Sequence, residues 1–233
     1  MPKRPLDIDP SNIISTGKKR RLQIPLSSTK EYYQAPQYTA CGTMCGGCKS
    51  TAVLGPRAYR EVNSDADPSK PPGIADARKK YPKCAFKAGH LLNATFGGNG
   101  SDSKNLVILT SGANVRCNSF DNKVKEALIH LKHIYEALAR YYVDIAQVDY
   151  GVKLEITVDK SKKWGTTAPD SYIHKVMFMK AAAYGTVDLT KLVDSAGDVL
   201  TLTETQKKDV NGHIAKFRTA LAPMANFRVD NLP

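Results

Sequence analysis

Apolar side chains recur at steps of three and four residues over a long central segment, and this spacing predicts an amphipathic helix. The helix is expected to begin near Asn114 or Ser119 and to end at about Tyr142. Asp121 is expected close to its start, where a negative charge would meet the positive end of the helix dipole. The apolar stripe consists of Val124, Leu128, Leu131, Tyr135 and Leu138.

Four shorter segments have the length and residue pattern of β-strands. These are residues 84–92, 106–109, 150–158 and 172–180. A glycine-, asparagine- and serine-rich loop separates the first two, and Thr203 can cap a final helix over residues 204–221. The order strand, strand, helix, strand, strand, helix predicts an α+β domain that ends in a helix.

Residues 1–37 are predicted to be a flexible appendage to a single domain that spans residues 38–233. They hold five prolines and the basic run Lys18-Lys19-Arg20-Arg21, but few apolar residues in any periodic pattern. The run is typical of a nucleic-acid arm or a targeting signal, and equally of a solvated charge cluster. Residues 61–82, rich in proline and aspartate, are expected to loop over the surface.

The charge balance favours partners that are rich in phosphate. The chain has 34 Lys and Arg against 22 Asp and Glu, which gives a formal net charge of +12. Each cation that neutralises a phosphate releases a condensed counterion, so the surplus favours nucleic acid, although a basic surface can also serve solubility alone. No apolar run approaches the roughly 18–20 residues of a membrane span, and no signal-peptide pattern follows the N-terminus. We expect no membrane span and a protein that is cytoplasmic when made.

One histidine and three asparagines are spaced so that a hairpin followed by a helix would bring them together. His90 ends the first predicted strand, and Asn114, Asn118 and Asn122 share one face of the long helix because they are four residues apart. A neutral imidazole can take a proton from water, and carboxamide oxygens suit a hard cation such as Mg²⁺. A base and a hydrated magnesium ion are sufficient to cut a phosphodiester.

The joint pattern resembles a known nuclease core. The segment Gly89-His90-Leu-Leu-Asn93, the glycine loop, Asn105-Leu106 and the turn Thr110-Ser-Gly-Ala-Asn114 are similar to the ββα-metal, or His-Me finger, core of the non-specific DNA/RNA endonucleases, especially the nuclease-toxin branch. The resemblance covers about residues 84–130. It implies that His90 activates water and that Asn114 is the direct protein ligand of Mg²⁺ (or Mn²⁺). It also implies a delivered toxin or effector, with an immunity protein or a delivery apparatus as partner.

Two positions depart from that family. Ala88 stands where the family often has a basic residue, with Lys87 one position earlier. Asn122 stands where many relatives have a glutamate, and its lack of charge should weaken metal binding, so a catalytically impaired relative is an alternative. The candidate substrate contacts are Lys87, Arg116, Lys163 and Trp164. Trp164 could stack on a base beside phosphate contacts, or equally anchor its own loop.

Three of the five cysteines crowd together as Cys41-x-x-x-Cys45-x-x-Cys48. With Cys84 or a histidine as fourth ligand they could hold a structural Zn²⁺, while free thiols are the other interpretation. The same spacing holds iron–sulfur clusters in radical enzymes, but nothing in the chain supplies their barrel. His130 and His133, three apart on the long helix, are interpreted as a surface pair.

Three functions are therefore weighed. The first is a metal-dependent endonuclease that hydrolyses DNA and/or RNA. The second is a non-catalytic, basic nucleic-acid-binding module in which the histidine and asparagines are inactive. The third is an interaction protein stabilised by zinc.

Overall fold

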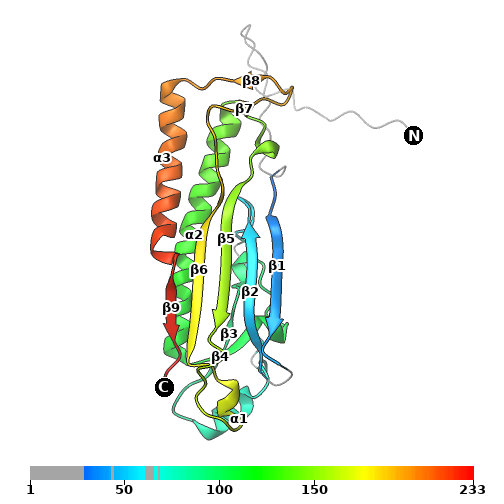
Figure 1. Cartoon of the computed structure of the whole chain (residues 1–233), viewed down its shortest axis with the longest axis vertical. Coiled ribbons are helices and arrows are strands. Elements are labelled where there is room, and N and C mark those ends of the chain that lie inside the picture. The colour runs from blue at the N-terminus through cyan, green and yellow to red at the C-terminus, as the bar shows by residue number, and fades with distance from the viewer. Residues whose placement is uncertain (1–28, 43–44, 61–65, 68) are drawn as a thin grey trace, which may run out of the picture.

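A five-stranded antiparallel sheet forms one layer of the protein, in the strand order β1-β2-β5-β6-β9 (Figure 1). The computed structural model describes residues 29–42, 45–60, 66–67 and 69–233. The strands are β1 (Tyr32–Ala40), β2 (Gly47–Leu54), β5 (Tyr150–Val158), β6 (Val176–Gly185) and β9 (Phe227–Asp230). The sheet and its helices make an α+β fold, as the sequence predicts.

Two helices, α2 (Ser111–Arg140) and α3 (Glu204–Leu221), cover one face of this sheet (Figure 1). The alternating side chains of β5 explain the packing, because every second one is buried beneath the helices. Tyr150 of β5 meets Phe217 of α3 with ring centroids 5.0 Å apart. The core thus lies between the sheet and the helix pair, while the other face of the sheet stays open to solvent.

The two long helices match the predicted ones in type, and one differs at its start. The α2 helix begins at Ser111 rather than near Asn114 or Ser119, because the Thr110 side chain caps it by accepting from the Ala113 N–H. Asp121 therefore lies about three turns inside the helix and not at its positive end. Thr203 caps α3 in a capping box with Gln206, as expected for this helix.

The strand and boundary predictions are only partly met. Residues 106–109 and 150–158 are strands as predicted, whereas β3 is confined to Lys87–His90 and β6 begins at Val176. The edge strand β1 begins at Tyr32, so residues 32–37 belong to the sheet and not to an appendage. Residues 1–28, including the basic run, lie outside the described residues.

The lower end of the molecule in Figure 1 holds a hairpin and a short helix. The hairpin is formed by β3 and β4 (Leu106–Leu109), and the helix is α1 (Ile74–Lys80), inside the stretch predicted to be a loop. A second small hairpin, β7 (Leu192–Val193) and β8 (Val199–Leu200), lies at the opposite end. In the described part of the chain, no helix combines the length and the apolar character needed to cross a membrane.

Candidate functional site

A hairpin followed directly by a long helix brings the predicted site residues to one end of the molecule. The β3 and β4 strands pair in the register Lys87 with Leu109 and His90 with Leu106. The chain leaves β4 at Leu109 and enters α2 at Ser111 after a single capping residue. His90 therefore ends β3 while Asn114 lies in the first turn of the helix that follows β4.

The start of α2 lies against the end of β3. The Oδ1 atom of Asn114 is 3.4 Å from the position that a Cβ atom on Gly89 would occupy. A side chain at position 89 would also collide with Leu109, so only glycine allows this close approach. The helix turn with Asn114 therefore lies against the strand end that carries His90, whose side chain is partly buried and whose Nε2 atom is buried.

The loop between the two strands is fixed by Asn105, which is fully buried. Its Oδ1 accepts from the Leu92 N–H at 2.8 Å, and its Nδ2 donates to the carbonyls of Leu92 at 3.0 Å and Asn99 at 3.1 Å. The loop is thereby closed directly behind His90. Asn105, which the sequence singled out only as the start of a strand, positions the histidine-bearing segment.

A second contact joins this loop to the helix. Asn93 caps the turn that follows it by accepting from the Thr95 N–H, and its Nδ2 donates to Oδ2 of Asp121 at 2.8 Å. Burial raises the pKa of Asp121 to about 7, and the hydrogen bond from Asn93 opposes that rise. Asp121 is thus an acidic group beside the loop that the sequence did not assign to the site.

The raised pKa of Asp121 predicts a pH-dependent stability. Between about pH 4 and 7 the folded protein keeps a proton that the unfolded chain has lost, so the free energy of unfolding should fall as the pH rises. Asp121→Asn should remove this fall and be more stable than the parent by about 1–3 kcal/mol at pH 8, with little difference at pH 4. Urea denaturation of both proteins at the two pH values measures this, and parallel pH profiles would contradict it.

The remaining predicted metal ligands lie further along α2. Asn118 and Asn122 are exposed, one and two turns beyond Asn114 on the same side of the helix. The structure thus places Asn114 against the hairpin, and leaves the other two facing solvent.

The four predicted substrate contacts fall into two groups. Lys87 on β3 and Arg116 on α2 are exposed. Trp164 instead packs between Tyr81 and Phe86, with ring centroids 5.4 and 5.2 Å away, and its Nε1 donates to the carbonyl of Asn231 at 2.9 Å. The indole anchors its loop, so of the two interpretations of Trp164 the structure favours the anchor over the base-stacking platform. Lys163 lies next to it, in a bridge with His174.

The cysteines are not gathered into a metal site. Thiols of Cys41, Cys45 and Cys48 approach backbone carbonyls of Gly47, Ser171 and Ala40 at 3.8, 4.0 and 3.3 Å. Among the described residues, a set of at least three His, Cys, Asp or Glu ligand atoms within 4.8 Å of one another occurs only at three histidines. The predicted set Cys41, Cys45, Cys48 and Cys84 is therefore not assembled, and burial raises the pKa of the Cys41 thiol to about 12.

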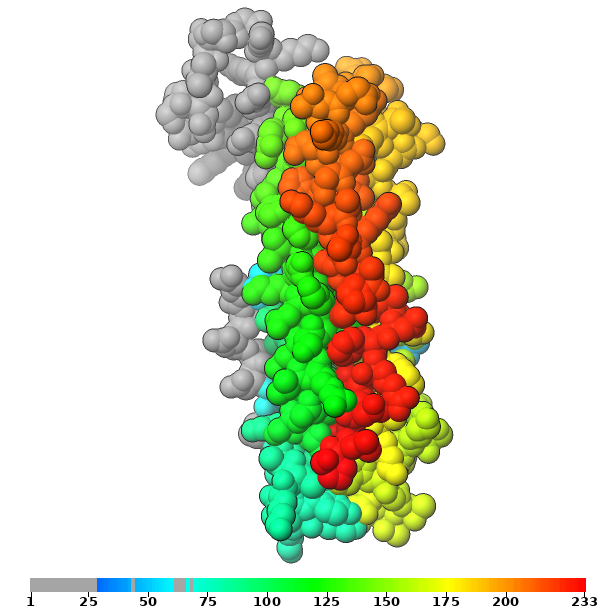
Figure 2. Space-filling view, turned by 90° about the vertical axis from the view of Figure 1, so that its left-hand side faces the viewer, coloured from blue at the N-terminus to red at the C-terminus, as the bar shows by residue number. Residues whose placement is uncertain are grey.

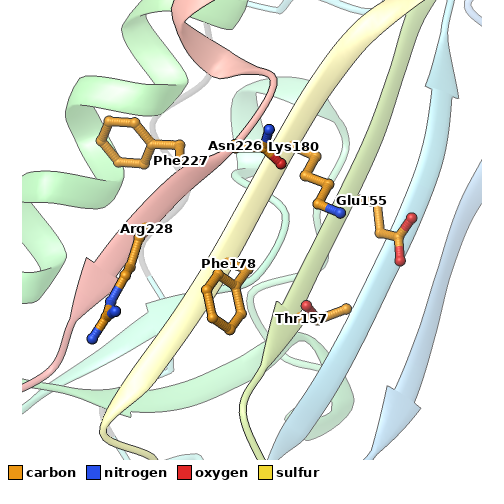
Figure 3. Close-up of a pocket in the computed structure, with 7 residues that line it drawn as sticks. All are labelled: Glu155, Thr157, Phe178, Lys180, Asn226, Phe227 and Arg228. Carbon is orange, nitrogen blue, oxygen red and sulfur yellow. The ribbon is translucent and has the colours of Figure 1, made fainter.

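The solvent face of the sheet carries exposed cations and exposed rings, and we call it the open face. Its exposed residues include Lys49, Lys153, Phe178, Lys180, Tyr184 and Arg228. Strand register places Lys180 opposite Glu155 and Phe178 between Thr157 and Arg228. Figure 3 shows the pocket that Glu155, Thr157, Phe178, Lys180 and Arg228 help to line. The Phe227 side chain turns toward α2, where its ring centroid is 5.6 Å from that of Phe120.

Comparisons with known proteins add no relative. No protein-family model matches the chain, and no curated protein is significantly similar to it.

Proposed function

We propose that the protein is a metal-dependent endonuclease that hydrolyses phosphodiester bonds of DNA and/or RNA. The observation that carries the proposal is the packing of the Asn114 carboxamide against Gly89, directly beside His90. In this proposal the partly buried imidazole at the end of β3 and the carboxamide oxygen at the start of α2 act on the same phosphate. The imidazole would serve as the water-activating base and the carboxamide oxygen as the metal ligand.

The donor set fits a hard, hydrated cation. The Asn114 carboxamide forms no hydrogen bond to another described residue, so its oxygen is free to bind an ion. Mg²⁺ keeps most of its own waters and needs few protein ligands, and when bound it would stabilise the charge that develops on the phosphate. His90 would take a proton from water, while Asn105 and Asn93 hold the segment that carries it.

The charged residues around this end suit a polyanionic substrate. Lys87 and Arg116 are exposed next to the hairpin and would contact phosphates on either side of the cleaved bond. The sequence resemblance supports the narrower proposal of a delivered toxin, with an immunity protein or a delivery apparatus as partner. Such an immunity protein would need acidic groups to cover Lys87 and Arg116.

A direct test is to incubate the full chain with plasmid DNA and with RNA, with Mg²⁺, Mn²⁺ or EDTA. We expect cleavage with either metal and none with EDTA. Absence of cleavage of both polymers, in preparations that are folded by circular dichroism, would refute the proposal.

The open face favours a second candidate function, binding of single-stranded nucleic acid without cleavage. Four exposed cations and the ring of Phe178, 38% exposed, share this surface, and a sheet that combines cations with a ring can hold phosphates and stack a base. Salt-sensitive binding of an oligonucleotide, lost in a double variant Lys153→Ala and Lys180→Ala but with no cleavage under any metal condition, would favour this function over the first.

A further inference from the structure

Three histidines from two helices meet where α2 and α3 lie side by side, as the surface in Figure 2 shows for the two helices. His130 and His133 come from α2, and His213 comes from α3. Their ligand nitrogen atoms lie within 4.8 Å of one another. The ring centroid of His133 is 6.1 Å from that of His130 and 5.4 Å from that of His213. We call this set the histidine cluster.

Two ring nitrogens of the cluster have no partner among the described residues. Nδ1 of His130 and Nδ1 of His213 are buried, and neither forms a hydrogen bond with any described residue. Buried polar atoms without a partner are rare in native proteins, and they call for an explanation. On the other side of the His213 ring, Nε2 faces Oδ1 of Asp209 at 3.8 Å. This distance is longer than a hydrogen bond, but a small shift of the ring would let the carboxylate accept from Nε2 and orient the histidine for binding a metal through its other nitrogen.

We propose that His130, His133 and His213 bind a Zn²⁺ ion that links α2 to α3, with water as the fourth ligand. Three neutral imidazoles with an open position are a common Zn²⁺ ligand set. Zn–N bonds of about 2.0–2.1 Å in a tetrahedron place the ligand nitrogens roughly 3.3 Å apart. Side-chain rotations that move each nitrogen by about an ångström would therefore bring all three to bonding distance of one ion. Burial and the neighbouring His133 lower the pKa of His130, which favours the neutral, ligating form at pH 7.

The zinc site is separate from the hydrolytic site. His130 lies 16 residues (130 − 114) beyond Asn114 on the same helix, a rise of about 24 Å. Among the charged groups that act on His130, Glu126 on α2 raises its pKa and Lys216 on α3 lowers it. The proposal therefore does not depend on whether the protein cuts nucleic acid.

The test is titration of the metal-stripped full chain with Zn²⁺ by calorimetry and with Co²⁺ by visible absorption. We expect one ion per chain and a tetrahedral Co²⁺ spectrum with no thiolate charge-transfer band. His213→Ala should weaken binding by more than 100-fold. Asp209→Asn, which removes the carboxylate charge but keeps an oxygen that can accept from the Tyr141 hydroxyl, should weaken it by about 10–100-fold. Zn²⁺ at 100 times its dissociation constant should raise the melting temperature by roughly 5–10 °C.

Asn211→Ala is the matched control, because Asn211 is exposed on α3 two residues before His213. It should bind Zn²⁺ like the parent. His90→Ala should also keep Zn²⁺ binding, so failure of the nuclease proposal would be seen separately. Absence of stoichiometric Zn²⁺ binding would overturn the inference. So would binding that survives His213→Ala or shows a thiolate band, because such binding would belong to the cysteines.

Discussion

Replacement of His90 by alanine is expected to lower the rate of Mg²⁺-dependent cleavage by about 10²–10⁴-fold, the usual contribution of a general base. His90 is the last residue of β3 and is only partly buried, so we expect its replacement to leave the fold intact, which circular dichroism checks. The loss should appear in kcat, while the affinity for an uncut oligonucleotide stays the same. Single-turnover cleavage of a labelled DNA or RNA strand, beside a binding assay, measures both quantities.

Two controls make the result specific to the imidazole. Added imidazole should restore part of the activity of His90→Ala, since a free base can occupy the space that the side chain has left. Ser119→Ala, an exposed change on the helix that carries Asn114, should cleave like the parent. If His90→Ala cleaves at the parental rate, another group activates the water and the assignment of His90 is wrong.

The sequence predicts those elements whose buried face has a clear period. The α2 helix shows apolar steps of three and four, and β5 alternates strictly, so both are recognised from the chain alone. β1 was missed because both of its faces carry mixed residues at the edge of the sheet. β2 was missed because its Gly47-Cys48 start looks like a loop and only long-range pairing makes it a strand. The α1 helix is too short and too close to prolines to give a period.

The site was predictable only where its residues are close in sequence or follow a known motif. His90 and Asn114 could be found from the hairpin-and-helix pattern, which places them at the ends of adjacent elements. Asp121 was misplaced because the helix begins at Ser111, well before it, and its contact with Asn93 could not be foreseen because it depends on how the loop folds onto α2. His213 had no local signal at all, since only the packing of α3 against α2 brings it to His130 and His133. Spacing within one element can be read from a sequence, whereas contacts between elements cannot.

Replacement of Asn231 by alanine is expected to lower the free energy of unfolding by about 3–5 kcal/mol, the largest stability effect that we predict. The buried carboxamide joins its own C-terminal segment to the end of β4 and to the segment before β6. Its Oδ1 accepts from the Thr110 N–H at 2.7 Å, and its Nδ2 donates to the carbonyls of Ile108 at 2.9 Å and His174 at 2.8 Å. Alanine would leave these three backbone groups buried without a partner, at about 1–3 kcal/mol each before relaxation.

The same substitution connects stability with the proposed chemistry, because Asn231 holds the residue that caps α2. A loss of 3–5 kcal/mol should lower the melting temperature by roughly 6–20 °C, measured by calorimetry. Asn226→Ala, an exposed asparagine in the same C-terminal segment, should change it little. Below its melting temperature, Asn231→Ala should also cleave more slowly than Asn226→Ala, since the start of α2 would no longer be held against β3. Equal melting temperatures for the two variants would show that the three hydrogen bonds do not stabilise this junction.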